Sequence, residues 1–406
     1  MKTPIITCLL LASIQAHADN FVMHEWGTFT TVSASDGSLL PGLEKEEESL
    51  PRSVYSLDNF YQVVGAPVGS KGFMLDRPLE NVTVKMETPV IYFYTDHAFK
   101  ASVKVDFHGG SISQWYPQRS SGEKAQPFKL PTTKISAKEF MEAVQKESSG
   151  MKIDFAKKLE GSIGWEIDVI PSGAEDNASI FRGDETPTWL HPRMTDSALV
   201  RTSGGEMEKY LFYRGLGNFE QAVKFTSRQN GDLVATNNSK QAVPALFVFQ
   251  NEGGKVKTLK FGPLAAGESN TVNTRGIPLQ EAWQKSVYQT MSGILQDQGL
   301  YRKEAEAMVQ TWWKSYFAHA GTRVFWILPQ TELNAVLPLS VNPTPSKSVR
   351  VMVGRTEILT PEFEADLLAK FKAAEEEGAY NPWVGDRFSK PYAKRVSQLS
   401  TKTVKR

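Results

Sequence analysis

The chain has 406 residues, with 46 Lys+Arg against 45 Asp+Glu, 40% hydrophobic residues and 22% charged residues. A formal net charge of +1 excludes the usual electrostatic nucleic-acid binder, which needs an excess of basic residues to release counterions. The balance of charged and hydrophobic residues also differs from that of a disordered tail or a bundle of membrane helices. We therefore expect a globular protein, too long for one ordinary core and built as two parts.

The N-terminus has the pattern of a secretory signal peptide. Lys2 gives a positive start, Ile5–Ile14 is an apolar run too short for a membrane anchor, and Ala16–Ala18 is an A-x-A cleavage site. Cleavage after Ala18 would remove Cys8, the one cysteine of the chain, and so exclude disulfides, thiolate metal sites and Cys nucleophiles. No later apolar stretch reaches the length of a transmembrane segment. These features predict a periplasmic or secreted protein.

Residues 19–276 are predicted to form an antiparallel, β-sandwich-like region. Phe21–Ser33 mixes aromatic and β-branched residues, and Ala101–Phe107 alternates between apolar and polar residues. Asn230-Gly231 separates two further strand-like segments, and this pair suits the positive φ angles of a type I′ hairpin turn. Short strands at this spacing are typical of a sandwich or a barrel.

Residues 277–406 are predicted to form an α/β region that packs on the first. Ala282–Leu295 and Ala305–Tyr316 carry apolar residues at helical spacing with Gly299 between them, which indicates a helical hairpin. Two strand candidates follow, and Thr360-Pro361 begins a last helix with a capping residue and Pro at the first helical position. The predicted fold class is therefore α+β.

Two charged segments stand out. Glu44–Glu48 (EKEEE) is predicted to be a solvated loop. The last 20 residues hold seven basic residues and no acid, and form a basic C-terminal tail. Such a tail would either contact an anionic lipid or polysaccharide, or be the solvated end of a helix.

The densest group of functional side chains is His24-Glu25-Trp26, close to the predicted mature N-terminus. On a strand, His24 and Trp26 share one face while Glu25 takes the other. His24 could act as a base or a metal ligand, Glu25 as a catalytic carboxylate, and Trp26 as a stacking surface for a sugar ring. The alternative is a structural strand whose Trp lies in the core and whose His and Glu are hydrogen-bonded.

A metal site would have to be assembled from distant segments. Five of the six histidines lie beyond residue 18, and none forms H-x-H, H-x-x-x-H or H-E-x-x-H, the spacings that place two ligands on one metal. His24 and His191 are the candidate ligands, and His with carboxylate would suit one divalent transition metal. The alternative is that these are ordinary loop and strand-end histidines.

Two arginines are candidate ligand-binding residues. Arg193 lies between His191 and Asp196. In a functional site, Arg193 could hold a carboxylate or phosphate of a ligand while Asp196 acts as a catalytic acid. Alternatively, Arg193 could form an ion pair with Asp196. Arg214 ends a predicted strand, before a Gly-spaced turn that lacks the third Gly of a dinucleotide site. Trp115 joins Trp26 as a candidate for stacking on a glycan.

Several segments resemble an uncharacterised family of bacterial secreted proteins that has an HEWGTFT motif near the mature N-terminus. They are Met23–Gly37, Lys85–Asp96, Tyr210–Phe219, and Gly299–Phe317 with Val349–Pro361. The resemblance spans nearly the whole mature chain and implies a bacterial envelope or secreted setting. It implies no catalytic residue, cofactor or substrate.

Two hypotheses for the function follow. The first is a non-catalytic envelope protein that binds a glycan or another protein through Trp26, Trp115, Arg193 and Arg214. The second is a periplasmic hydrolase or His/carboxylate metalloenzyme centred on His24, Glu25, His191 and Asp196. The enzyme hypothesis predicts that the His24 and His191 segments meet Arg214 in one cleft. Binding is favoured because no recognised catalytic spacing is present.

Overall fold

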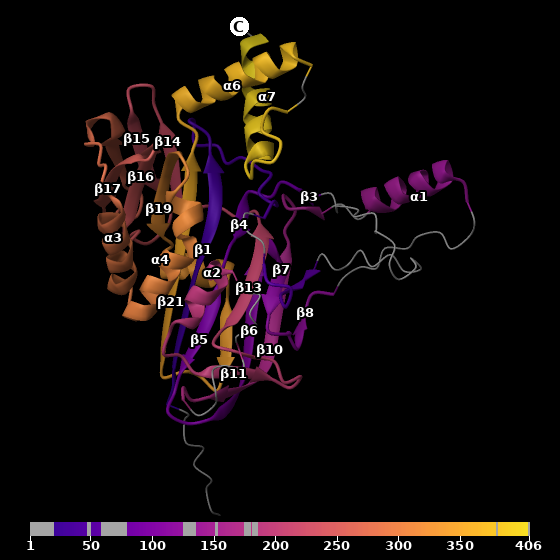
Figure 1. Ribbon diagram of the computed structural model, residues 1–406, viewed down its shortest axis with the longest axis vertical. Helices are drawn as coiled ribbons and strands as arrows, with labels where there is room; N and C mark the ends of the chain where they lie inside the picture. The colour runs from indigo at the N-terminus through magenta and orange to yellow at the C-terminus, as the bar shows by residue number, and fades with distance from the viewer. Residues whose placement is uncertain are drawn as a thin grey trace, which may run out of the picture.

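The computed structural model describes residues 20–46, 50–57, 79–124, 135–150, 153–173, 180, 186–378 and 381–404. Over these residues the fold is mixed α+β, with most strands gathered in several sheets and seven α-helices around them (Figure 1). This confirms the predicted α+β class and the β-rich N-terminal region. No helix in these ranges is both long and apolar enough to cross a membrane. The predicted signal peptide, residues 1–18, lies outside the described residues.

A ten-stranded sheet forms the centre of the molecule. Its strands are, from edge to edge, β17 (Lys255–Phe261), β16 (Leu246–Glu252), β19 (Gly321–Ile327), β21 (Lys347–Ile358), β1 (Val22–Ser33), β4 (Val84–Met86), β13 (Leu211–Gly217), β7 (Gly110–Tyr116) and β2 (Tyr55–Ser56), with β5 (Val90–Tyr94) beside β1 and β13. β1 pairs in parallel with β21 along its whole length, from Val22 opposite Lys347 to Ser33 opposite Ile358. Strands from before and after residue 276, the predicted boundary between the two regions, thus belong to one sheet.

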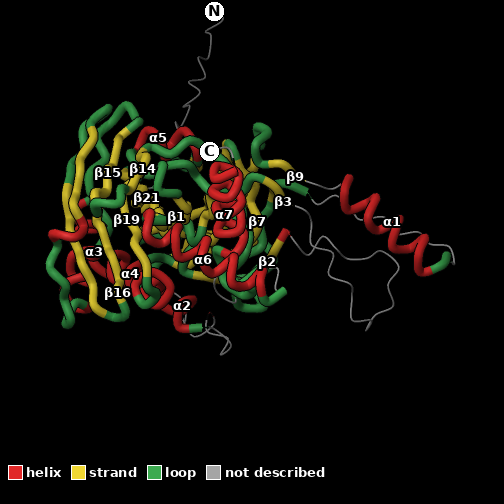
Figure 2. Tube along the Cα trace, turned by 90° about the horizontal axis from the view of Figure 1, so that it is seen from above, coloured by secondary structure: helices red, strands yellow, loops and turns green. Residues whose placement is uncertain are grey.

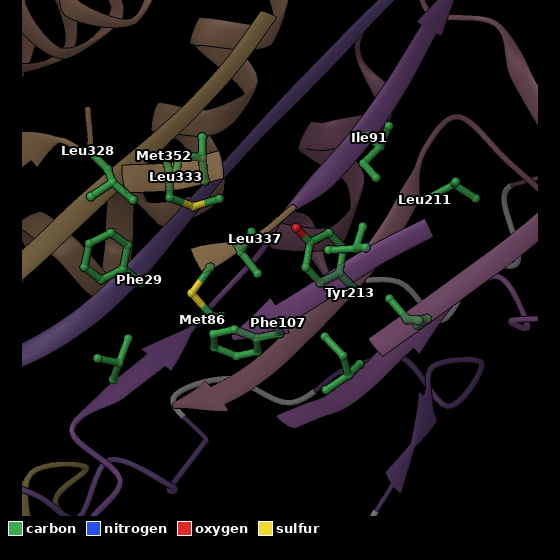
Figure 3. Packing of buried hydrophobic residues seen from close by; sticks show 14 of the residues in the cluster. Phe29, Met86, Ile91, Phe107, Leu211, Tyr213, Leu328, Leu333, Leu337 and Met352 are labelled. Carbon is green, nitrogen blue, oxygen red and sulfur yellow. The ribbon is translucent and has the colours of Figure 1, made fainter. Parts of the chain in front are cut away.

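A second sheet shares a hydrophobic core with one face of the central sheet. Its strands are β12 (Met207–Glu208), β11 (Leu199–Thr202), β10 (Glu160–Ile170), β6 (Phe99–His108) and β20 (Leu339–Asn342), with β8 (Ser121–Gly122) beside β10. The core joins Phe29, Met86 and Tyr213 of the central sheet to Phe107 of β6 and Leu333 of α5 (Gln330–Val336) (Figure 3). Alternation along each strand places these side chains on one face.

Helices cover the opposite face of the central sheet. The elements there are α2 (Pro187–Leu190), the 3-10 turn His191–Arg193, α3 (Gln284–Asp297) and α4 (Arg302–Phe317). Trp26, Tyr92, Phe212 and Phe325 of the sheet share a second core with α3 and α4. Seen from above, α6 (Pro361–Glu376) and α7 (Ser389–Val404) lie across the end of the sheet near β1 (Figure 2). The face of the central sheet that α2, α3 and α4 cover holds the site described below.

The remaining elements lie around these layers. A three-stranded sheet contains β14 (Val223–Ser227), β15 (Asp232–Asn237) and β18 (Ser269–Asn273), and β3 (Leu79–Glu80) pairs in parallel with β9 (Ile153–Asp154). The helix α1 (Ala137–Gly150) stands away from the body of the molecule (Figure 1). A short 3-10 turn, Thr274–Gly276, follows β18.

The predicted hairpin turn at Asn230-Gly231 exists, but its type differs from the prediction. β14 and β15 pair as antiparallel strands around it, with the Gly231 N–H donating to Arg228 O at 3.0 Å. Gly231 has a φ of 88°, whereas Asn230 is not among the residues with positive φ. A type I′ turn needs positive φ at both central residues, so the turn fits instead a four-residue connection that ends in a left-handed glycine.

The charged segments are partly docked on one another. Arg395 of α7 is buried against Glu364 of α6, at 2.8 Å between Nε and Oε1, and Lys390 forms an ion pair with Glu44. The expectation of a solvated loop is therefore wrong for Glu44, whose side chain is only 16% exposed. The basic tail is likewise not a free arm at Arg395, because the ion pair and burial hold it against the body.

Gly27 of the HEWGT segment lies where β1 passes closest to the chain between β4 and β5. A Cβ atom at this position would stand 2.8 Å from Pro89 Cα and 3.0 Å from Thr88 O, which are backbone atoms that cannot rotate away. We expect Gly27→Ala to lower the free energy of unfolding by about 1–3 kcal/mol through overpacking. Urea denaturation measures this change. Gly204→Ala, with 3.8 Å to its nearest neighbour, is the control and should change stability by about 0.5 kcal/mol at most.

Candidate functional site

The candidate site lies on the helix-covered face of the central sheet, around Arg214 of β13. Phe212 and Arg214 point to this face because alternate residues of a strand do, while Tyr213 belongs to the core on the other side. Arg214 is 2% exposed and donates from Nε to the backbone carbonyl of Glu87 at 2.6 Å. That contact fixes the guanidinium at the edge of a small cavity.

The cavity is bounded by β5, β13, α2 and α4. Its volume is about 10 Å³, which is room for about one water molecule. It is lined by Leu50, Pro51, Thr88, Val90, Thr186, Thr188, Trp189, Pro192, Tyr210, Phe212, Arg214, Thr311 and Trp312. The cavity therefore has room for a single polar group rather than for a whole ligand.

Three side chains lining this cavity carry donors that lack a partner among the described residues. They are Thr88 Oγ1, Trp189 Nε1 and Trp312 Nε1, all buried. Trp189 is fixed by edge-to-face packing on Phe212, with 5.0 Å between ring centroids. An indole N–H can only donate, and a buried donor left unpaired costs about 1–3 kcal/mol. A group that presents acceptor oxygens would satisfy these donors.

Two cations beside the cavity hold one carboxylate. Glu46 Oε2 lies 2.5 Å from Arg214 Nη1 and 2.9 Å from Lys85 Nζ, and the Lys85 side chain is fully buried. Burial opposes the ionised form of Glu46, but Arg214 and Lys85 outweigh it and hold the pKa of this carboxyl below its ordinary value. Lys85 and Arg214 thus form a clamp that binds an anionic oxygen.

The cationic cluster continues toward α7. Arg387 forms an ion pair with Glu87, and Glu357 accepts from Arg323 Nε at 3.0 Å and Arg355 Nη2 at 2.6 Å. Among the described residues of this cluster, five cations (Lys85, Arg214, Arg323, Arg355 and Arg387) face three carboxylates (Glu46, Glu87 and Glu357). Burial raises the pKa of Glu87. Buried, paired charges thus extend from the clamp to Arg387, just before α7.

The structure separates two residues that the enzyme hypothesis combines. His24 is buried and its Nδ1 lies 2.7 Å from Oε2 of Glu304 on α4, with the Tyr301 ring 4.4 Å from its own. Glu25 points to the opposite face, where it accepts from Tyr213 Oη at 2.7 Å and Arg350 Nε at 2.6 Å. Because successive side chains of β1 alternate, His24 and Glu25 belong to two different environments.

The second predicted cluster divides in the same way. Arg193 is buried and donates to both carboxylate oxygens of Glu208, with 2.7 Å between Arg193 Nη2 and Glu208 Oε2. Asp196 is exposed and pairs with Lys303 at 2.5 Å, so the expected pairing of Arg193 with Asp196 is wrong. His191 is partly buried, and its burial lowers the pKa of the imidazole. In the described ranges, no group of three or more His, Cys, Asp or Glu side chains could hold a metal ion.

Both tryptophans predicted to stack on a glycan are covered. Trp26 has no exposed surface and stacks on Tyr92, with 6.0 Å between the ring centroids. Trp115 is 5% exposed and lies beneath Arg119, whose Cζ is 3.8 Å from the Trp115 ring centroid. Trp26 is buried because β1 is a central strand covered on both faces. In this structure neither ring offers a face to a ligand, which corrects the expectation for both.

The site residues that sequence reasoning missed are Lys85, Glu46, Thr88, Trp189 and Trp312. One signal was available for Lys85, which stands alone between Val84 and Met86 in an otherwise apolar strand. Buried lysines are rare unless they are paired, so such a position points to a partner elsewhere in the chain. No local pattern identifies Glu46 as that partner.

Comparison with known proteins adds little to this geometry. No protein-family model and no curated protein matches the sequence. Among solved structures, the chain is similar to the mu-homology domain of yeast delta-COP-I in complex with a Dsl1 WxWxV peptide, at 7% identity and a TM-score of 0.27, over 84% of this chain and 98% of that one. The same domain without the peptide gives 7% identity and a TM-score of 0.26 over the same shares. Likeness at this level carries no argument about function.

Proposed function

We propose that this chain is an exported bacterial envelope protein that binds the acidic end group of a glycan at the Arg214 cavity. The pattern of residues 1–18 and the resemblance to bacterial secreted proteins support export. Binding, rather than chemistry, is supported by a site made of donors and cations. Trp26 and Trp115 have no part in this proposal, because both are covered.

One observation carries the proposal: the cavity beside Arg214 is lined by three buried donors that lack partners in the described part of the chain. A carboxylate supplies acceptor oxygens for Thr88, Trp189 and Trp312, and its charge is complementary to Arg214 and Lys85. A neutral sugar hydroxyl satisfies the donors but gains no ion pair with Arg214 or Lys85. The acidic group is therefore the recognised part of the ligand.

The matched probes are galacturonate and galactose, which differ at the group that the site should recognise. Isothermal titration of the folded protein is expected to show binding of galacturonate and none of galactose. Inorganic phosphate serves as a second anion and separates recognition of carboxylate from recognition of any anionic oxygen. Equal binding of galacturonate and galactose, or binding of neither, would contradict the proposal.

Removing one donor at a time gives a sharper prediction. Trp312→Phe and Trp189→Phe each keep an aromatic ring and remove the N–H, so each should weaken galacturonate binding about tenfold, as expected for one hydrogen bond to a charged acceptor. Each variant should also lose some stability, because Phe fills less of the buried volume than Trp does, so circular dichroism checks that the variant is folded before titration. Trp383→Phe, at the α6–α7 contact, is the control and should leave the affinity unchanged.

A second candidate is a hydrolase in which His24 acts as the base. The Nδ1 contact with Glu304 orients the imidazole as base-orienting carboxylates do, and Nε2 has no partner among the described residues. In this version of the enzyme hypothesis, Glu304 is the carboxylate partner of His24, and Glu25, His191 and Asp196 have no role. Hydrolysis of a panel of ester and glycoside substrates that is lost in His24→Gln, with folding retained, would support it, and metal analysis of protein purified without added metal tests the metalloenzyme branch.

A further inference from the structure

We infer that Glu46 is an internal ligand: its carboxylate occupies the anion clamp of Lys85 and Arg214 and leaves when an acidic ligand binds. This inference rests on the proposed function and adds a regulatory contact to it. Glu46 supplies the same chemical group that the site is proposed to recognise. Its two ion pairs, at 2.5 Å to Arg214 and 2.9 Å to Lys85, are the contacts that an external carboxylate would take over.

The clamp and its occupant differ in how they are held. Lys85 and Arg214 lie on β4 and β13 in the central sheet, with side chains 0% and 2% exposed. Glu46 lies outside the helices and strands, and its side chain is 38% exposed. The cations are therefore fixed by the sheet, whereas the carboxylate approaches from the solvent side. Of these three charged side chains, Glu46 is the one with substantial surface open to solvent.

Contacts of the two residues before Glu46 keep its segment close to the clamp. Lys85 Nζ also donates to the backbone carbonyl of Lys45 at 2.8 Å, Glu44 pairs with Lys390, and Lys45 Nζ donates to Asp386 O at 3.2 Å. These contacts do not use the Glu46 side chain. The segment is thus anchored at residues 44 and 45, and the Glu46 carboxylate can leave the clamp without their loss.

An external ligand competes with a tethered one, so it needs something that Glu46 lacks. Glu46 makes no hydrogen bond with Thr88, Trp189 or Trp312, whose donors stay unpaired in the described structure. A tethered group acts at an effective concentration of roughly millimolar. A ligand that bridges the clamp and the cavity donors gains hydrogen bonds that Glu46 does not make, and this difference drives the exchange.

Occupation of the clamp by Glu46 should lower the apparent affinity for ligand in proportion to the fraction of unoccupied sites. If Glu46 occupies the clamp for about nine-tenths of the time, its removal tightens binding about tenfold. Glu46→Gln removes the charge and keeps an acceptor of the same length. Glu281→Gln removes the same charge from an exposed pair with Lys255, which has no part in the clamp or its anchors, and is the matched control.

The experiment is titration of galacturonate and of inorganic phosphate into the full chain and its variants, with circular dichroism as the check on folding. We expect about tenfold tighter binding to Glu46→Gln and an affinity for Glu281→Gln within twofold of the unchanged protein. Glu46→Asp keeps the charge on a shorter side chain, should give an intermediate affinity, and replaces Glu46→Gln if that variant does not fold.

The possible results separate the inference from the proposed function. Binding to the unchanged protein with the same affinity in Glu46→Gln, or an equal gain in Glu281→Gln, overturns the inference and leaves the proposed function standing. No binding of either anion to the unchanged protein or to Glu46→Gln overturns both. Binding to Glu46→Gln alone also contradicts the inference, because the ligand then does not displace Glu46 from the clamp of the unchanged protein.

Discussion

Replacing Glu357 by alanine is expected to lower the free energy of unfolding by about 3–5 kcal/mol. Glu357 is buried on β21 and accepts from both Arg323 and Arg355, whose side chains are 2% and 1% exposed. Without this carboxylate, two buried guanidinium groups lose their shared counterion, and leaving a buried charge uncompensated is far more costly than losing a surface pair. Urea denaturation followed by circular dichroism measures the change.

The control for this prediction is Glu306→Gln, which removes an exposed pair with Arg302 on α4 and should change stability by at most about 0.5 kcal/mol. Acid provides a second test. Although burial opposes ionisation, Arg323 and Arg355 lower the pKa of Glu357 below its ordinary value of 4.5. Its contribution to stability is therefore present above about pH 4.5 and is lost as the pH falls. Equal acid sensitivity of the unchanged protein and Glu357→Gln would contradict this account.

The Trp26→Ala substitution is expected to lower the free energy of unfolding by about 3–5 kcal/mol, because it removes a large side chain from a core that cannot collapse around the space. Trp26 has no exposed surface, lies on a strand covered on both faces, and packs with Tyr92 and the helix-side core. Thermal and urea unfolding both measure the loss. Trp26→Phe keeps most of the apolar volume and should cost clearly less.

The same substitution decides between the two roles considered for Trp26. A core residue loses stability on truncation, whereas a ligand-stacking residue loses affinity with stability almost unchanged. If Trp26→Ala unfolds as the unchanged protein does but no longer binds a glycan, the ring belongs to a binding surface and the buried assignment is wrong. We expect the opposite, with affinity retained in the fraction that remains folded.

Local signals in the sequence are enough to predict several elements. Thr360 caps α6 as predicted, with its Oγ1 accepting from Phe363 N at 3.2 Å and Pro361 at the first helical position. Ser136-Ala-Lys-Glu139 has the spacing of a capping box, and the structure contains it, with Glu139 Oε2 accepting from Ser136 N at 2.8 Å. Gly378 follows α6 with a φ of 78°. These features depend on residues three or four positions apart, which the sequence itself places in contact.

The site depends on residues far apart in the chain, and no local pattern identifies them. Glu46 meets Arg214 across 168 positions, and His24 meets Glu304 across 280. The sequence places Arg193 close to Asp196, yet burial makes Glu208 its partner. Which cation meets which carboxylate is settled by the strand order of the central sheet, whose neighbours come from opposite ends of the chain.

The sequence by itself determined that the chain is an α+β protein with a β-rich N-terminal region, because alternation and helical periodicity are properties of neighbouring residues. It also determined that His24 and Glu25 point in opposite directions, since a strand has a period of two. Only the tertiary structure decided that Trp26 lies in a core and that Lys85 and Arg214 form a clamp. Burial and ion pairing depend on which layers cover a strand, and distant segments supply those layers.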